Sequence, residues 1–322
     1  MTDETMPRPT VTTGAAEPGD EGRHEPGPEQ FWNESWYLDW TNEAGTLGGY
    51  VRLGLYPNYT PDRGAAWYWA CVVGEDRPLV TVIDHDAPIP AGRSLEIRTE
   101  GLWADHTVET PLDHFTIGCE AFAVGVDDPA EVYEDLRGDR VPFGLDLEWE
   151  TDGGTYSYPG GVTRYEVPCK VHGEILVGDE RIEFDGWGQR DHSWGVRDWW
   201  TMGWSWTAGR LDDGTRFHGT HVTWDGTPIF QTGYVQPPGQ PLVAVTTFDR
   251  DQDLGCEGFP ERGTCLFDNV TMRIEPVAFS PVLLTAPDGR VARFPRALCR
   301  FHEVGGEGRH GVGWTEWNQP ES

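Results

Sequence analysis

GWGQRDHSWGVRDWW, residues 186–200, is the stretch of this chain that differs most from an ordinary strand sequence. It contains two arginines, two aspartates, one histidine and four tryptophans, whereas a plain surface strand needs only alternating apolar and polar residues. Charged groups set among tryptophans tend to be buried and paired, because removing them from water without a partner is costly.

An extended backbone would sort these side chains onto two faces. Arg190, His192 and Trp194 would share one face, while Asp191 and Ser193 would point to the other. We therefore expect one face to look into a cavity and the other into packing.

Outward from this stretch, short β-favouring runs alternate with turn signals along the whole chain. The 41 glycines and 25 prolines, together with the lack of sustained helical spacing, argue against long helices. Residues 127–139 are the best helix candidate. The predicted strands before residue 160 are 49–56, 66–73, 79–84, 94–102, 115–124 and 144–150. Those after it are 163–177, 181–188, 204–209, 215–223, 228–235, 242–248, 270–274, 282–285, 291–297 and 311–317.

The length of 322 residues favours two domains. The sequence TDGGTYSYPGG, residues 151–161, is rich in glycine and is predicted to connect them. Residues 1–30 hold almost no large apolar side chain, so we expect a disordered acidic tail. The predicted organisation is this tail, one β domain over 31–155 and a second over 160–322, which carries the RDHSWG stretch.

The formal charge of −30 arises from 54 acidic residues against 24 basic ones. Such a surface repels nucleic acid phosphates and anionic membranes, so neither is an expected partner. An acidic surface that attracts a cationic substrate remains an alternative to a simple solubility trait. No run of 18 apolar residues and no secretory signal pattern occurs, and we expect a cytoplasmic protein.

Two hypotheses explain the charged stretch. In the structural one, Arg190 pairs with Asp198, or Arg197 pairs with Asp191, in a buried contact that joins the domains. In the catalytic one, an aspartate beside indole rings has a raised pKa and stays protonated, as a general acid must. Tryptophan faces would then stabilise a developing carbocation.

Two other positions are weighed as site residues. His218 and His221 fall on opposite faces of a strand and so do not favour one metal ion, but His218 could face a cavity. Glu316 could face a cavity or pair with an arginine. The chain has no phosphate-binding, dinucleotide-binding, nucleophile-elbow or zinc-protease motif, and we expect neither a cofactor nor a metal.

The RDHSWG and RDW elements, at residues 190–195 and 197–199, resemble those of actinobacterial proteins in the lipocalin-like carotenoid hydratase (hydroxyneurosporene synthase) and AttH-like superfamily. The similarity extends more weakly through 204–206, 217–220 and GVGWTEWN at 311–318. It covers most of the second half, while the first half is similar only in size and strand pattern.

This resemblance implies an all-β fold of two packed lipocalin-like antiparallel barrel or sandwich domains. It also implies a hydrophobic ligand of isoprenoid, steroid or lipid type, held in a barrel cavity. Relatives include hydratases, cyclising enzymes and a fungal survival factor thought to handle lipids without catalysis. The resemblance does not fix the activity.

We therefore predict cofactor-independent acid catalysis: hydration or dehydration, isomerisation or cyclisation. The rival hypothesis is a noncatalytic carrier, and a weaker third is a stress or assembly factor that acts through its acidic surface. The ligand and the oligomeric state stay open. Asp191 or Asp198 would be the acid and His192 a relay, and the expected ligand-binding residues are Arg190, Trp194, Arg197, Trp199, Trp204, Trp206 and His218.

Overall fold

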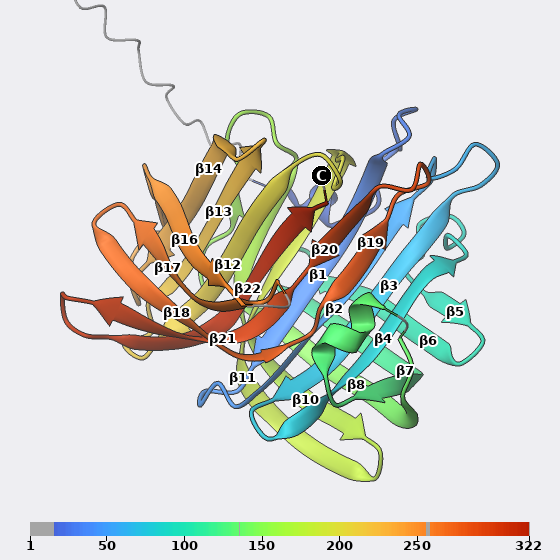
Figure 1. Ribbon diagram of the computed structural model, residues 1–322, viewed down its shortest axis with the longest axis horizontal. Coiled ribbons are helices and arrows are strands. Elements are labelled where there is room, and N and C mark those ends of the chain that lie inside the picture. The colour runs from blue at the N-terminus through green and yellow to red at the C-terminus, as the bar shows by residue number, and fades with distance from the viewer. Residues whose placement is uncertain (1–15, 135, 256–257, 322) are drawn as a thin grey trace, which may run out of the picture.

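The computed structural model describes residues 16–134, 136–255 and 258–321, and nearly all regular structure in these ranges is β-strand (Figure 1). The helices in the described ranges are two short 3-10 helices, η1 (Pro18–Glu21) and η2 (Pro129–Tyr133). Neither of them has the length and apolar character needed to span a membrane. The prediction of an all-β fold with very little helix is confirmed.

The helix candidate at 127–139 forms only η2, a single 3-10 turn that the Asp128 side chain caps at the backbone N–H of Ala130. Strand pairing begins again at Asp139, which pairs with Gly125.

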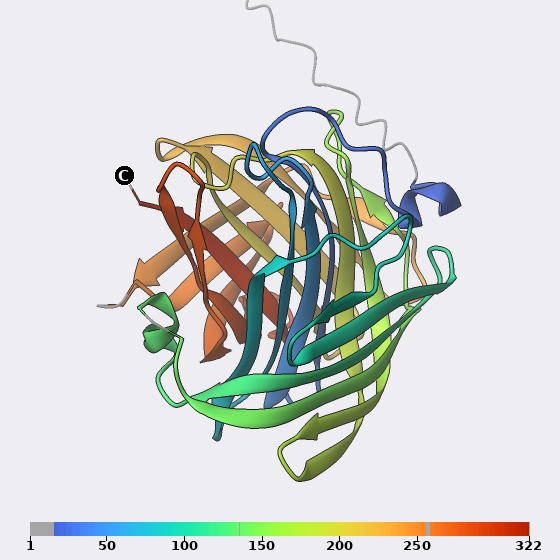
Figure 2. The ribbon, with the colours of Figure 1, turned by 90° about the vertical axis from the view of Figure 1, so that its right-hand side faces the viewer.

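The first sheet runs in the order β4-β3-β2-β1-β11-β10-β8-β7-β6-β5, with β9 paired to β10. An additional β4–β7 pairing closes eight of these strands into a ring, which Figure 2 shows curling round on itself. The strands are β1 (Trp32–Thr41), β2 (Leu47–Tyr56), β3 (Ala65–Gly74), β4 (Arg77–Ala87), β5 (Ile97–Thr99), β6 (Leu102–Thr110), β7 (His114–Val126), β8 (Asp139–Thr151), β9 (Tyr156–Ser157), β10 (Arg164–Val177) and β11 (Glu180–Val196).

The second sheet runs in the order β15-β14-β13-β12-β22-β21-β18-β17-β16, and the β19–β20 hairpin is attached through β22. It packs against the first sheet, beside β1 to β3 in Figure 1. The strands are β12 (Gly203–Leu211), β13 (Arg216–Trp224), β14 (Thr227–Gln236), β15 (Val243–Ala244), β16 (Phe248–Leu254), β17 (Pro260–Phe267), β18 (Val270–Phe279), β19 (Val282–Thr285), β20 (Val291–Phe294), β21 (Arg296–Val304) and β22 (His310–Pro320).

The boundary between the sheets lies between β11 and β12, not at residues 155–160 as predicted. The glycine-rich segment 151–161 leads into β9, which pairs with β10 of the same sheet, so its glycines mark a turn rather than a linker. As a result β10 and β11, and with them the RDHSWG stretch, belong to the first sheet.

The molecule has three main apolar cores. One fills the inside of the closed ring and includes Trp36, Trp40 and Trp149. A second lies between the two sheets, and a third lies inside the curve of the second sheet. Every residue of β1 is buried, because its two faces point into the first two cores.

The N-terminal segment differs from the prediction of a tail over 1–30. Residues 1–15 lie outside the described part of the chain, but residues 16–31 pack onto the first sheet. Glu21 is buried there and forms an ion pair with Arg190 of β11 at 2.7 Å. Sequence reasoning missed this because the apolar content of the segment is low, and a buried ion pair holds it in place instead.

Candidate functional site

A mainly apolar cavity of about 330 Å³ lies between the two sheets. This corrects the expectation of a cavity inside a barrel: tryptophans and aliphatic side chains fill the ring of the first sheet. Exposed apolar residues such as Val196 and Ile229 mark its rim. The lining residues are Ser35, Tyr37, Arg52, Tyr158, Val162, Arg164, Asp191, Ser193, Val196, Arg197, Asp198, Trp199, Met202, Trp204, Trp206, Thr220, Val222, Ile229, Phe230, Phe294, Arg296 and Glu316.

Strand β11 presents its side chains as the alternation predicts. Asp191 and Ser193 line the cavity, whereas Arg190, His192 and Trp194 do not. Because successive side chains of an extended strand point to opposite faces, Asp191 reaches the cavity while its neighbours Arg190 and His192 do not.

Asp191 is the most buried carboxyl group on the cavity wall, with 5% of its side chain exposed. Its Oδ2 accepts a hydrogen bond of 2.7 Å from Arg164 Nη2. Burial raises the pKa of Asp191 to about 8; the nearby carboxylates of Glu166 and Glu316 add to the rise, and Arg164 opposes it. At neutral pH this group holds a proton that it can donate.

Glu166 pairs with Asp191 across the β10–β11 ladder and contacts the same guanidinium, but its pKa shifts in the opposite direction. It accepts hydrogen bonds from Arg164 Nε at 2.7 Å, Trp206 Nε1 at 3.0 Å and Gln189 Nε2 at 3.1 Å. Burial alone would raise its pKa, but Arg164, His218 and these donors hold the pKa of Glu166 below its ordinary value. Two buried carboxyls face one arginine, so Glu166 carries the negative charge and Asp191 keeps the proton.

Asp198 lines the cavity at a more open position. Arg290 Nη1 contacts its two carboxylate oxygens at 3.1 and 3.0 Å, and Asp198 also caps the backbone N–H of Trp200. The predicted pairs Arg190–Asp198 and Arg197–Asp191 do not form: Arg190 binds Glu21, and the Arg197 guanidinium contacts Ser193. The predicted ion pairs were wrong because they were sought within residues 186–200. The observed partners of Arg190 and Asp198, Glu21 and Arg290, lie far from that stretch in the sequence.

Four of the predicted ligand-binding residues line the cavity. They are Arg197, Trp199, Trp204 and Trp206. The indole rings of Trp199 and Trp204 meet edge to face at 5.1 Å. Trp206 is fixed by its hydrogen bond to Glu166.

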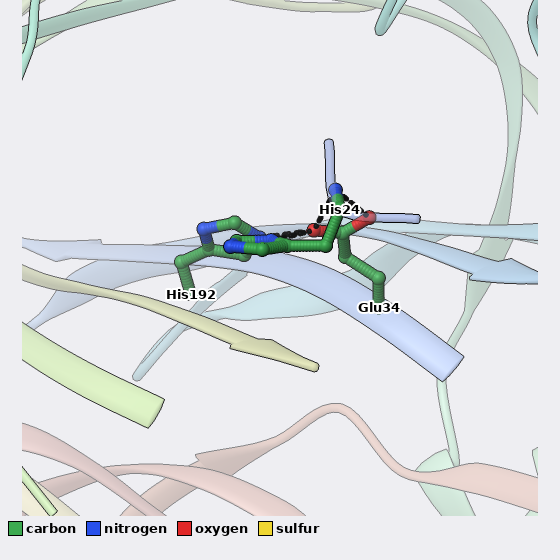
Figure 3. Close-up of side chains that lie close together, drawn as sticks. All are labelled: His24, Glu34 and His192. Atoms are coloured by element: carbon green, nitrogen blue, oxygen red, sulfur yellow. Dashed lines mark hydrogen bonds and ion pairs between the residues drawn. The ribbon is translucent and has the colours of Figure 1, made fainter. Parts of the chain in front are cut away.

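His192, predicted as a relay, lies on the other face of β11, away from the cavity. It belongs to a cluster with His24 and Glu34, shown in Figure 3. Glu34 Oε1 lies 2.7 Å from His24 Nδ1 and 3.0 Å from His192 Nε2. Their ligand atoms lie within 4.8 Å of one another, a donor set that zinc can accept. The Glu34 carboxylate is hydrogen-bonded to both imidazole rings and to the backbone N–H of His24. The cluster therefore also holds the N-terminal segment against the first sheet.

Arg190 and Trp194 share this face of β11 and are likewise absent from the cavity wall. Trp194 stacks on the His24 ring at 3.8 Å. Both residues therefore contact the N-terminal segment and do not line this cavity.

His218 is fully buried one layer behind the wall. Its Nδ1 lies 3.1 Å from the carbonyl oxygen of Thr207, and its Nε2 lies 2.8 Å from the hydroxyl of Tyr158, which does line the cavity. Burial lowers the pKa of His218 to about 4, so the ring is neutral.

Among the polar lining residues that sequence reasoning missed are Arg52, Tyr158, Arg164 and Arg296. Each lies on an ordinary strand-like or turn-like stretch and gains its place only through strand pairing. Arg164, for example, lies beside Ser193 because β10 pairs with β11. Glu316 meets both alternatives considered for it, since it lines the cavity and pairs with Arg296 at 2.8 Å.

The fold and the cavity define the class of protein: two curled antiparallel sheets of lipocalin-like type that enclose a mainly apolar cavity at their interface. Within that class, the chain belongs to the family of the domain of unknown function DUF7064, whose model matches residues 17–321. No curated protein matches the sequence.

Solved structures share the fold over most of their length. An AttH-like protein from Nitrosomonas europaea superimposes with a TM-score of 0.66 at 17% identity, covering 96% of this chain and 98% of that one. Kievitone hydratase from Nectria haematococca gives 0.62 at 10% identity, covering 96% and 94%. CghA in complex with Sch210972 gives 0.57 at 12% identity, covering 91% and 89%. At these identities the likeness establishes the fold.

Proposed function

We propose that this protein binds a hydrophobic small molecule of isoprenoid, steroid or lipid type in the cavity between its sheets and transforms it by acid catalysis without a cofactor. The observation that carries the proposal is Asp191, a buried carboxyl with its pKa raised to about 8 on the wall of a mainly apolar cavity. A protonated acid beside an apolar ligand can start the acid-catalysed forms of hydration, dehydration, isomerisation and cyclisation.

In a hydration, Asp191 gives its proton to one carbon of an alkene and becomes a carboxylate. Water adds to the carbocation at the other carbon, and the proton that this water loses returns to Asp191. The indole faces of Trp199, Trp204 and Trp206 would stabilise the cation. Dehydration is the reverse, and isomerisation or cyclisation omits the water.

The buried network behind the wall has a positioning role in this proposal. Glu166 fixes Arg164 and Trp206 by direct hydrogen bonds. Because Arg164 also donates to Asp191, this network holds the Asp191 carboxyl and the Trp206 indole ring in fixed positions. His192 faces away from the cavity, so we do not route the proton through it.

A noncatalytic carrier is the second candidate, and one observation favours it. Each carboxyl that lines the cavity contacts an arginine: Asp191 with Arg164, Asp198 with Arg290 and Glu316 with Arg296. A carrier could keep all its carboxyls paired in this way.

The test begins with native mass spectrometry of the purified protein and extraction of any bound hydrophobic compound. That compound is then incubated with wild type, Asp191→Asn and the control Asp198→Asn. A gain or loss of one water, or an isomer, made by wild type and Asp198→Asn but lost in Asp191→Asn supports the acid role. A compound that all three proteins return unaltered supports the carrier.

A further inference from the structure

The cavity wall carries more positively charged side chains than carboxylates that pair with them. Four arginines line it, and two of them are neutralised: Arg164 by Glu166, and Arg296 by Glu316. Asp198 is turned to Arg290, which does not line the cavity. Among the described residues, no carboxylate lies within ion-pair distance of the remaining two, Arg52 and Arg197.

Arg52 is buried, with 3% of its surface exposed. Its guanidinium is stacked by Trp69 at 4.5 Å and Trp199 at 4.8 Å, and its Nη2 donates to the Tyr56 hydroxyl. Its Nη1 has no hydrogen-bond partner within the described part of the chain. A buried guanidinium with an unused donor is a costly arrangement unless something in the cavity completes it.

Arg197 approaches the same part of the cavity from the end of β11. It contacts the Ser193 hydroxyl and the backbone oxygens of Thr163 and Trp194, all uncharged acceptors. Burial lowers the pKa of Arg197 to about 10; the positive charges of Arg164 and Arg52 add to this, and Asp191 opposes it.

We infer that the ligand of this cavity is an amphiphile with an anionic oxygen group, such as a carboxylate, which binds Arg52 and Arg197 while its apolar body packs on the tryptophans. A planar guanidinium matches carboxylate geometry and forms strong charge-assisted hydrogen bonds. The inference deepens the proposed function and rests on it, since it takes this cavity to be the ligand site.

The anion would also remove an electrostatic conflict in the proposed chemistry. Two uncompensated arginines near Asp191 would oppose a carbocation in the same cavity. A ligand that brings its own negative charge neutralises them, so that positive charge can develop on its apolar part beside the indole rings.

Two fluorescent probes with the same aromatic body test this inference. 8-Anilinonaphthalene-1-sulfonate carries an anionic group, and N-phenyl-1-naphthylamine is the neutral equivalent. The net charge of −30 would disfavour the anionic probe, so any preference for it must come from local arginines. We expect the sulfonate to bind at least about tenfold more tightly, a ratio equal to about 1.4 kcal/mol.

The variants Arg52→Gln and Arg197→Gln should remove this preference and leave binding of the neutral probe unchanged. Arg197→Lys, which keeps the charge, should retain part of it. The control Arg262→Gln alters an exposed arginine away from the cavity and should behave as wild type. Trp204→Ala should weaken both probes.

The outcomes separate this inference from the proposed function. If the neutral probe binds in a Trp204-dependent way but the sulfonate binds no more tightly, or its preference survives both glutamine variants, the anionic ligand is excluded while the hydrophobic cavity stands. If neither probe binds, or neither depends on Trp204, the cavity is not the ligand site and both proposals fail.

Discussion

At the scale of single residues, Asp191 and Glu166 show how neighbours decide the state of a carboxyl group. Both are buried and both contact Arg164 at 2.7 Å. Glu166 also accepts hydrogen bonds from Trp206, Gln189 and Tyr158. Asp191 accepts its hydrogen bond from Arg164. Burial therefore dominates at Asp191, and donor number dominates at Glu166.

The raised pKa of Asp191 predicts a pH-dependent loss of stability. Between the ordinary value of 3.8 and about 8, the folded state holds a proton that the unfolded state has released, so the free energy of unfolding falls as pH rises through this window. Asp191→Asn lacks this titration. Its melting temperature should therefore rise relative to wild type as pH increases from about 4 to about 8.

Thermal unfolding followed by circular dichroism at a series of pH values measures this difference. The control is Asp225→Asn on an exposed turn, whose melting temperature should follow wild type throughout. A difference between Asp191→Asn and wild type that stays constant with pH would show that Asp191 is ionised across the whole range.

Sequence alone could predict that Asp191 lies on the face of the strand opposite Arg190 and His192, but not which of the two faces meets the cavity. It could not predict Arg164 or Arg52, because their place on the wall depends on the pairing of β10 with β11 and of β1 with β2. Residues from distant elements become neighbours only when the register is known.

At the scale of elements, β11 links the N-terminal segment to the cavity. One face of β11 points into the ring of the first sheet and holds Arg190 against Glu21 and His192 against Glu34, while the opposite face carries Asp191. The irregular segment 16–31 therefore covers the strand that carries the proposed acid. Composition predicted a tail over 1–30, since it does not reveal ion pairs made with strands far along the chain.

Removing one partner of the Glu21–Arg190 pair should destabilise the protein. Glu21→Gln leaves a buried guanidinium without its counter-charge, and the expected cost is about 3–5 kcal/mol of unfolding free energy. Urea denaturation measures it. The control Glu25→Gln lies on the exposed part of the same segment and should change stability little. Equal stability of the two variants would mean that this segment does not depend on the ion pair.

At the scale of the whole molecule, the two sheets share a core that neither could complete alone. Trp206 and Trp314 of the second sheet pack in one cluster with Tyr37, Tyr50 and other residues of the first. Trp314 Nε1 also donates to the Trp40 carbonyl oxygen across the interface. The sequence predicted two β units of similar size, but it could not place the cavity between them, because facing surfaces are set by tertiary packing.

This shared core predicts that both sheets unfold together. Trp314→Ala should cost about 3–5 kcal/mol, the usual effect of truncating a buried aromatic side chain, and should shift one common transition. Tryptophan fluorescence and far-ultraviolet circular dichroism should give coincident urea curves in wild type and variant. Two separate transitions, with only one moved by the substitution, would show that the sheets are independent units.

We propose above all that Asp191, on the wall of the cavity between the sheets, is a carboxylic acid that is protonated at neutral pH. Infrared titration tests it most directly, through the carbonyl band of protonated carboxyl groups in wild type, Asp191→Asn and Asp198→Asn. We expect a band in wild type and Asp198→Asn that disappears as pH rises through about 8 and is absent from Asp191→Asn. Identical carboxyl bands in wild type and Asp191→Asn on both sides of that pH would contradict it.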